Sequence, residues 1–390
     1  MTQATRQNGL HLPTLAIAGF RGVRELTINR LGRVTLLTGE NGAGKTTVLE
    51  AVRVFAARGQ QSALTSLLHD RDEYAADAEG EANAIPGRIP DKVRALDFAA
   101  LFFGRSLSKK RIAIGPVSAA GRLTIEEVAL TEEQLSLIDG LIPELPADDA
   151  IQALLSRFQG TEQIHPFVLN DDGSPVDART QAQAARILKR AAGSKPSPPE
   201  IRCRSLGPGV LEGDQIAEYW DAIALTDDED AAVDALKLVA GNGVRRAAVV
   251  GDRRRFRHQT RPIVRFKGDP DPVPLKSLGD GAVRLFGVAL ALANSRDGFL
   301  VIDEAENGIH YSVQQRFWRM VLETAEANNV QVLATTHSLD CVVGFARAAT
   351  ECENIEGALA RINRRNGEVW AVEYSEEDMR VAAEQGIEVR

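Results

Sequence analysis

Residues 39–46 read GENGAGKT, and this stretch decides the fold. It matches the pattern G-x-x-x-x-G-K-[ST] between an apolar run at 33–38, which predicts a strand, and a helical pattern that starts at Lys45. Its glycines allow a tight turn in which backbone N–H groups point at phosphate oxygens, and the helix N-terminus adds partial positive charge. We therefore expect a nucleotide site formed by Gly39, Glu40, Asn41, Gly42, Ala43, Gly44, Lys45, Thr46 and Thr47.

Five side chains are expected to carry the chemistry of this site. The ammonium group of Lys45 is suited to neutralising charge on the β- and γ-phosphates, and the hydroxyl of Thr46 is a ligand for Mg²⁺. The run FLVIDE predicts a central strand with Asp303 and Glu304 at its carboxyl end, where open α/β sheets bind ligands. We expect Asp303 to hold the metal with Thr46. Glu304 is then placed to polarise the attacking water as a general base, and Glu306 is a second candidate for that base.

Two further segments are expected at the phosphates. His337 ends the predicted strand VQVLATTH, where it can hydrogen-bond the γ-phosphate or the attacking water, although a histidine in such a place is often only structural. The segment SLGDG at 277–281 precedes a long apolar helix. The hydroxyl of Ser277 and the amides around Gly279 and Gly281 are suited to phosphate oxygens. The sequence therefore carries a second phosphate-binding turn besides the first.

Composition limits the class of protein. The chain has 390 residues, 44% of them hydrophobic, and no apolar run long enough to span a membrane. The first fifteen residues lack the pattern of a signal peptide. The three cysteines have no metal-binding spacing, so we expect a soluble, cytoplasmic protein. The net charge of −8 excludes a uniformly basic nucleic-acid binder and leaves only a local basic patch for DNA.

The order of predicted elements indicates an α/β fold with an insertion. Strands are expected at 14–19, 23–28 and 33–38, a hairpin at 111–130, and strand–helix alternation again after residue 298. Helical patterns interrupted by prolines predict a helical insertion at 131–240. Within it we expect a helix in the run DDAIQALLSRF at 148–158, and a second helix started by a capping box of Thr226 and Glu229. Near the C-terminus, Asn366-Gly367 predicts a type I′ hairpin turn.

A basic run at 252–268 allows two interpretations. It contains Arg253, Lys267 and five further arginines, with Phe256 among them. One interpretation is a patch that binds the backbone of DNA or RNA. The other, slightly favoured, is a solvated hairpin whose arginines pair with acidic side chains, because strand alternation places only part of the run on one face.

The motifs together resemble a family. GENGAGKTT, SLGDG, VIDEAENGIH and ATTHS, in this order and with GFRGVREL near the start, are similar to ABC-type ATPases of the RecF, SMC and OLD branch. The resemblance covers residues 12–130 and 240–350. It implies an ABC-type P-loop NTPase head over 10–390, with a mixed sheet, an antiparallel β subdomain and the insertion. In this family the signature turn of one subunit, here Ser277, Gly279 and Gly281, caps the ATP of the other, so a homodimer or higher homo-oligomer with ATP and Mg²⁺ between its subunits is implied, with Arg21 near the nucleotide.

The same resemblance suggests a role. OLD-like nucleases carry a TOPRIM nuclease domain after the histidine strand, and the residues after His337 show no Glu and Asp-x-Asp set of that kind. The chain therefore looks like a stand-alone OLD-like AAA ATPase that regulates a separate effector, a TOPRIM-like nuclease, as in anti-phage defence modules. The alternative is a RecF- or SMC-like ATPase that binds DNA in repair through the basic run.

Overall fold

The computed structural model describes residues 9–74, 96–107, 110–129, 151–168, 199–252, 259–269, 271–375 and 377–379, and positions 132, 136, 183, 186, 187 and 381. The chain divides into two compact units. Unit 1 comprises residues 1–15, 27–49 and 201–390, and unit 2 comprises residues 16–26 and 50–200. Each unit has its own sheet and its own buried side chains.

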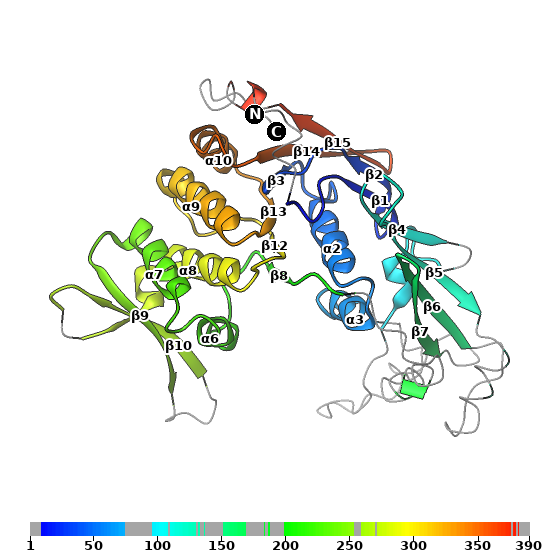
Figure 1. Cartoon of the computed structure of the whole chain (residues 1–390), viewed down its shortest axis with the longest axis horizontal. Coiled ribbons are helices and arrows are strands. Elements are labelled where there is room, and N and C mark those ends of the chain that lie inside the picture. The colour runs from blue at the N-terminus through cyan, green and yellow to red at the C-terminus, as the bar shows by residue number, and fades with distance from the viewer. Residues whose placement is uncertain are drawn as a thin grey trace, which may run out of the picture. The chain divides into compact units, whose positions relative to one another are not determined.

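Unit 1 is built on a six-stranded mixed sheet in the order β15-β14-β3-β13-β12-β8 (Figure 1). Five strands run parallel, and only β15 is antiparallel to its neighbour. The central strands are buried along their whole length, as expected for parallel strands covered on both faces. Their carboxyl ends therefore meet at one edge. The strands are β3 (Val34–Thr38), β8 (Cys203–Leu206), β12 (Phe299–Ile302), β13 (Gln331–Thr335), β14 (Gly357–Arg365) and β15 (Glu368–Tyr374).

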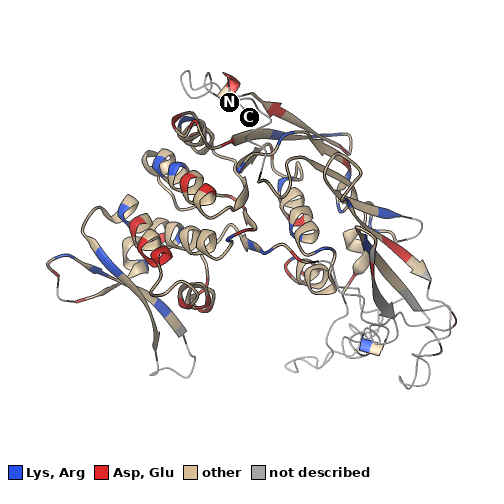
Figure 2. Cartoon of the chain, viewed as in Figure 1, with Lys and Arg blue, Asp and Glu red and all other residues tan. Residues whose placement is uncertain are grey.

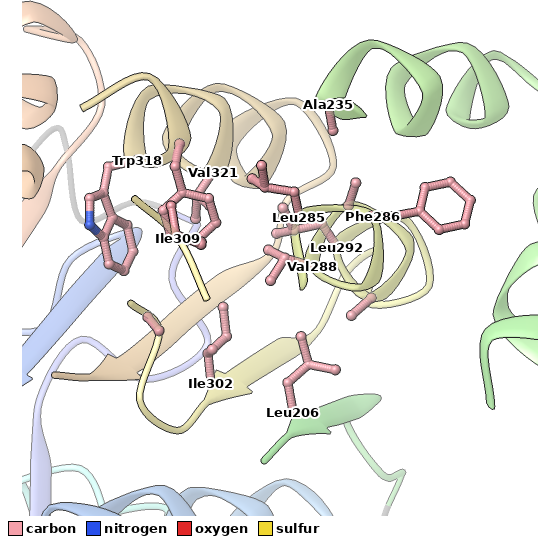
Figure 3. Close-up of a cluster of buried hydrophobic side chains, with 14 of the residues drawn as sticks. Leu206, Ala235, Leu285, Phe286, Val288, Leu292, Ile302, Ile309, Trp318 and Val321 are labelled. Atoms are coloured by element: carbon pink, nitrogen blue, oxygen red, sulfur yellow. The ribbon is translucent and has the colours of Figure 1, made fainter. Parts of the chain in front are cut away.

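Three helices of unit 1 lie side by side along the sheet: α8 (Asp280–Ala293), α9 (Gln314–Ala327) and α10 (Leu339–Glu351) (Figure 1). Helix α8 is buried from Ala282 to Ala293, so it runs through the core. Figure 3 shows side chains of α8 in one buried cluster with Trp318 and Val321 of α9 and Leu206 of β8. Burying a large apolar side chain contributes about 1.5–3 kcal/mol, so this cluster fixes α8 against the strands.

A smaller layer of unit 1 precedes α8. The antiparallel strands β9 (Val244–Asp252), β10 (Gln259–Phe266) and β11 (Val273–Pro274) form a three-stranded sheet. Helix α6 (Gly213–Asp221) packs on β10, and α7 (Asp227–Ala240) packs on β9. The chain then passes through a 3₁₀ turn, η3 (Leu275–Leu278), into α8.

Unit 2 contains the predicted antiparallel β subdomain, a six-stranded sheet in the order β2-β1-β4-β5-β6-β7. Its helices are α3 (Gln61–His69) and the 3₁₀ helix η1 (Phe98–Leu101), with the larger part of α2 (Lys45–Ala56), which begins in unit 1. The buried guanidinium group of Arg58 stacks between the rings of Phe55 and Phe158. The strands are β1 (Leu15–Phe20), β2 (Val23–Ile28), β4 (Arg111–Gly115), β5 (Leu123–Ala129), β6 (Ile151–Phe158) and β7 (Thr161–Val168).

Most predicted elements are confirmed. The three N-terminal strands, the hairpin β4–β5 and the alternation after residue 298 lie within two residues of the expected bounds. Asn366 and Gly367 have φ of 53° and 83°, as a type I′ turn requires. Trp318 and Phe317 are buried in the core. No helix in the described part of the chain is long and apolar enough to cross a membrane.

The predicted helix at 148–158 is wrong. Residues Ile151–Phe158 form strand β6, which pairs with β5 on one side and with β7 on the other. The physical reason is the turn that follows. Gln159 and Gly160 have φ of 48° and 78°, which closes a two-residue hairpin and commits both flanking segments to strands. The described part of 131–240 therefore contains strands as well as the helices α6 and α7.

The predicted capping box is also wrong, although helix α7 begins where expected. The Thr226 hydroxyl donates to the carbonyl oxygen of Ile223, at 2.6 Å, instead of accepting from the helix. Glu229 accepts from the N–H of Leu225 at 2.7 Å, one residue before the expected donor. Four acidic residues in the first turn still favour this helix start through the macrodipole.

Candidate functional site

The phosphate loop joins the carboxyl end of β3 to the first turn of α2, as predicted. Gly39 has φ of +136°, and a Cβ atom there would lie 2.2 Å from the carbonyl oxygen of Ile362 in β14, so only glycine fits. At the N-terminus of α2 the first backbone N–H groups have no helical partner. Ala43 and Thr47 are buried, whereas Glu40, Asn41, Gly42 and Thr46 are exposed. The loop therefore presents free donors on its outer side.

Lys45 is buried and lies across this loop. Its Nζ atom donates to the carbonyl oxygens of Gly39 at 2.7 Å and Glu40 at 2.9 Å. Burial lowers the pKa of the Lys45 ammonium from its ordinary value, and the carboxylates of Asp303, Glu306 and Glu304 oppose that shift. The carboxylates offset the burial only partly. An incoming phosphate would supply the missing negative charge.

The residues expected to hold the metal lie together. The Thr46 hydroxyl donates to Oδ2 of Asp303 at 3.0 Å, which joins the phosphate loop to the end of β12. The other oxygen, Oδ1, accepts from the hydroxyl of Thr335 at 2.5 Å. A hydroxyl and a carboxylate are the oxygen ligands that Mg²⁺ prefers. This donor set fits a Mg²⁺ ion with most of its remaining ligands supplied by water and phosphate.

Glu304 follows Asp303 in an unusual backbone conformation, with φ of +48°. Its N–H donates to the Thr335 hydroxyl at 2.9 Å. Its carboxylate accepts from Nδ2 of Asn307 at 2.6 Å, and the same nitrogen donates to the carbonyl oxygen of Pro208 at 3.1 Å. Backbone and carboxylate are thus both held in place, as a general base requires.

Glu306 and His337 meet beside this turn. Oε1 of Glu306 accepts from the backbone N–H of His337 at 2.7 Å. The imidazole of His337 is exposed, and its Nδ1 lies 3.4 Å from Nζ of Lys45. Because an ammonium group only donates, Nδ1 is the acceptor in this contact and the ring proton lies on Nε2. The Nε2–H group is then available to a phosphate oxygen or a water.

The predicted signature turn, residues 277–281, begins a helix as expected. Ser277 lies in η3 and Gly279 precedes α8 with φ of +91°. Ser277, Gly279 and Asp280 are exposed. Gly281 faces the loop that follows Glu304, because a Cβ atom there would lie 2.4 Å from the carbonyl oxygen of Gly308. The turn therefore presents the Ser277 hydroxyl and its exposed outer side to solvent, whereas the N–H of Gly279 already donates to the carbonyl oxygen of Lys276 at 3.1 Å.

Arg21 lies in unit 2 and is engaged there. Its buried guanidinium forms an ion pair with Glu50 at 2.9 Å and lies 3.6 Å from Glu73. It also donates to the carbonyl oxygen of Leu67 at 3.1 Å. Its contact with the nucleotide stays a prediction.

The basic run lies partly outside the described residues, because 253–258, which include Arg253, are not described. Arg261, Arg265 and Lys267 lie on or beside β10 and are exposed. The described part of the run forms β10, which pairs antiparallel with β9. Both interpretations of its arginines, contact with nucleic acid and pairing with acidic side chains, stay predictions. Figure 2 shows basic residues on β9 and β10 and acidic residues on the helices α6 and α7 beside them.

Three side chains at the site were not predicted: Thr335, Asn307 and Arg284. Thr335 could have been found, because it ends the strand next to Asp303 and carries a hydroxyl. Asn307 lies within the quoted run VIDEAENGIH, but nothing in its spacing indicates that it reaches back to Glu304. Nothing in the sequence around Arg284, which lies within the apolar run of α8, indicates that it reaches this site.

Fold and site define a P-loop nucleotide-binding protein, and the comparisons with known proteins agree. The family model described as "AAA domain, putative AbiEii toxin, Type IV TA system" matches residues 243–341, and one described as "AAA domain" matches residues 14–66. The uncharacterized protein MJECL11 of Methanocaldococcus jannaschii is 36% identical over 91 residues, which is 23% of this chain and 78% of that protein.

Two solved structures are similar over most of the chain at low identity. A crystal structure of an SMC head bound to the C-winged helix domain of ScpA covers 95% of this chain and 100% of that chain, with a TM-score of 0.46 and 14% identity. The SMC head domain of Thermotoga maritima covers 94% and 100%, with a TM-score of 0.41 and 15% identity.

The family matches lie on the segments that carry the phosphate loop and the Asp303–Glu304 strand. On these matches the chain is similar to AAA-domain proteins, and its motifs, in their order, resemble those of ABC-type ATPases of the RecF and SMC type.

Proposed function

We propose that the protein hydrolyses ATP with Mg²⁺. The observation that carries this proposal is the Thr46–Asp303 contact of 3.0 Å, which joins the phosphate loop to the carboxylates at the end of β12. In this proposal Thr46 and Asp303 hold the ion, which when bound offsets negative charge on the phosphates. Lys45 leaves the carbonyl oxygens it now contacts and binds phosphate oxygens.

The attack on the γ-phosphate is assigned to the strained turn. Glu304 orients a water and accepts its proton. One carboxylate oxygen, Oε2, is held by Asn307, and the other oxygen is assigned to the water. His337 donates from Nε2 to the transferred group or to the water. Glu306 is the weaker candidate for the base, because one of its oxygens already accepts from the His337 backbone.

The test is phosphate release by the purified chain with ATP, with and without Mg²⁺. We expect turnover that requires the ion, and a loss of about 10²-fold or more in Asp303→Asn, because an amide removes the charge that holds the cation. Arg296→Gln is a matched surface control, since Arg296 lies past the end of α8 and pairs with Asp228. Turnover by Asp303→Asn at the parental rate would contradict the assignment.

The proposal includes a homodimer or higher homo-oligomer. The signature turn carries an exposed hydroxyl and the open N-terminus of α8, which is a ready site for phosphate oxygens. In a head-to-tail pair this turn would cap the nucleotide of the partner subunit. ATP would then favour the closed pair and hydrolysis would loosen it.

A downstream role is proposed from the resemblance of the motifs alone. The ATP-driven pair would regulate a separate effector, a TOPRIM-like nuclease, in phage or genome defence. Producing the chain with a nuclease encoded beside it tests this, with DNA cleavage measured with and without ATP and repeated with Lys45→Ala. Cleavage that is the same in every case would contradict the proposal.

A second candidate function is DNA binding, as in repair ATPases. The observation that favours it is the pairing of Arg246 on β9 directly opposite Arg265 on β10, with both side chains exposed. Like charges directly opposite each other destabilise a sheet. An anion bound on this face would reduce the repulsion between the two arginines. Arg261 lies on the same face of β10, four residues before Arg265.

A further inference from the structure

Arg284 connects α8 to the end of β12. It is 3% exposed, and its guanidinium contacts four backbone carbonyl oxygens. Nη1 donates to Gly207 at 2.5 Å and Gly209 at 2.7 Å, in the loop after β8. Nη2 donates to Asp303 at 2.8 Å and Glu304 at 3.1 Å. One side chain of the signature helix thus holds the carbonyls of both proposed catalytic carboxylate residues.

Burying the Arg284 guanidinium at this position is unfavourable because the charged group loses its hydration. Burial lowers the pKa of the Arg284 guanidinium, and the carboxylates of Glu306, Asp303 and Glu304 oppose the shift only partly. Replacing a whole buried ion pair by apolar groups of similar size is often neutral or stabilising, so buried charge is weak evidence for a role in stability. Stability alone therefore does not account for an arginine here, whereas a need to fix four carbonyls in one arrangement does.

The carbonyls it fixes belong to a strained turn. Glu304 adopts the left-handed region with φ of +48°, a conformation that is unfavourable for a residue with a side chain and persists only when its surroundings impose it. Thr335 holds the N–H of Glu304, and Arg284 holds its carbonyl. That carbonyl also accepts from the N–H of Asn307 at 3.1 Å. Asn307 in turn holds the Glu304 carboxylate, so the backbone arrangement sets the direction of the proposed base.

A second contact joins the same two segments at the signature turn. Gly281, in the first turn of α8, packs against Gly308, which has φ of +76° and lies in the loop after Glu304. A side chain at 281 would collide with the Gly308 backbone. Helix α8 is therefore attached to the Glu304 loop at two points, its first turn and Arg284, and a shift of the helix must move the loop.

We propose that Arg284 is a positioning residue that holds Glu304 in its strained conformation and couples the signature turn to the catalytic turn of the same chain. The inference rests on the proposed ATPase function. Engagement of the signature turn by a partner subunit's nucleotide then adjusts the base in the subunit that supplies the turn. The two nucleotide sites of a pair are linked by this route.

The test uses two substitutions and a control in the full chain. Arg284→Met removes the donors with similar length, Arg284→Lys keeps the charge with a single donor group, and Arg296→Gln changes an exposed arginine just beyond α8. Hydrogen exchange of the backbone amides of Ala305 and Asn307 is measured without nucleotide, so this readout does not depend on hydrolysis. ATP affinity and turnover are measured in the same proteins.

We expect the two amides to exchange about tenfold faster in Arg284→Met, with Arg284→Lys intermediate and Arg296→Gln unchanged. Turnover should fall about 10²-fold in Arg284→Met while ATP affinity stays within about threefold, because misplacing a catalytic group by about 1 Å has that effect. Parental exchange and turnover in Arg284→Met would overturn the proposal. If that variant fails to fold, parental exchange of these amides in Arg284→Lys overturns it. If the parent itself does not hydrolyse ATP, the proposed function fails, and the exchange measurement still decides the positioning role.

Discussion

Two helix N-termini in unit 1 have the same local design and different surroundings. The phosphate loop precedes α2 and the signature turn precedes α8. The loop carries three glycines with positive φ and the turn carries one, Gly279, and each has a hydroxyl residue two positions from such a glycine. Around the first, the chain supplies its own lysine, carboxylates and histidine within hydrogen-bond distance. Around the second, Ser277, Gly279 and Asp280 face solvent.

This difference in surroundings indicates that the site at the phosphate loop is supplied by one chain, whereas the site at the signature turn is not. The phosphate loop has a buried ammonium group for charge and a carboxylate at 3.0 Å from its threonine for a metal. The signature turn has donors for a phosphate but is bordered on its inner side by the backbone of Gly308. A ligand of the signature turn must therefore come from outside, and the pair proposed above provides one.

The largest effect is expected from removing the charge at the first terminus. Lys45→Ala should weaken ATP binding about 100-fold or more, because each charge-assisted hydrogen bond to a phosphate contributes about 1.5–3 kcal/mol. Calorimetric titration with ATP measures this. Lys276→Ala, an exposed lysine beside the signature turn, is the matched control and should keep the parental affinity. An equal loss of ATP affinity in the two variants would contradict the proposed difference between the two helix N-termini.

A pair of glycine substitutions should separate the two termini further. In Gly39→Ala the new methyl group meets the Ile362 carbonyl at 2.2 Å, so the phosphate loop must shift and ATP affinity should fall at least tenfold. In Gly281→Ala the methyl group meets Gly308 at 2.4 Å, so the signature turn must shift, turnover should fall, and ATP affinity should fall less than in Gly39→Ala. Binding and phosphate-release assays on both variants decide the point. A strong loss of affinity in Gly281→Ala would contradict the separation.

A moderate effect is expected at the carboxylate turn. Asn307→Ala frees the Glu304 carboxylate and should lower turnover about tenfold with little change in ATP affinity. Steady-state phosphate release gives both quantities. Asn329→Ala is the control: this half-buried asparagine bonds to Asp297 and Arg33, none of which is among the candidate site residues, so turnover should not change. A change in affinity alone at Asn307 would argue that this residue shapes the nucleotide pocket and not the base.

The smallest effect is expected away from both termini. Arg246→Glu combined with Arg265→Glu should weaken binding to duplex DNA and flatten its dependence on salt by about two in the log–log slope, about one for each phosphate that the protein no longer neutralises. Fluorescence anisotropy over a range of salt concentrations measures this, and ATPase activity should not change. No DNA binding by the parent would remove this second candidate function.

How much could be predicted from the sequence depends on the physical source of each feature. The phosphate loop and the strand ending in Asp303 follow from local rules, because glycine turns, apolar runs and helix starts are encoded in adjacent residues. Strand β6 could not be predicted from its own amino-acid sequence. Its apolar residues suit a helix or a strand, and the hairpin turn at Gln159-Gly160 decides between them.

The residues that orient the candidate site were the hardest part of it to predict from the sequence. Arg284 lies 19 residues before Asp303 in the chain, and its contacts are all with backbone carbonyls, which have no sequence signature. Thr335 reaches Asp303 only because β12 and β13 are neighbours in the sheet. Such contacts arise from tertiary packing, so a single sequence indicates the candidate site residues more readily than the groups that orient them.

The most direct test of the central claim, that the signature turn completes a partner's site, is the mass of Glu304→Gln in solution with and without ATP and Mg²⁺. The substitution should preserve binding and stop turnover, so the closed pair should accumulate. We predict that ATP doubles the mass, and that adding Ser277→Arg to Glu304→Gln abolishes the doubling. A mass that ATP leaves unchanged, or a doubling that survives Ser277→Arg, would contradict the account.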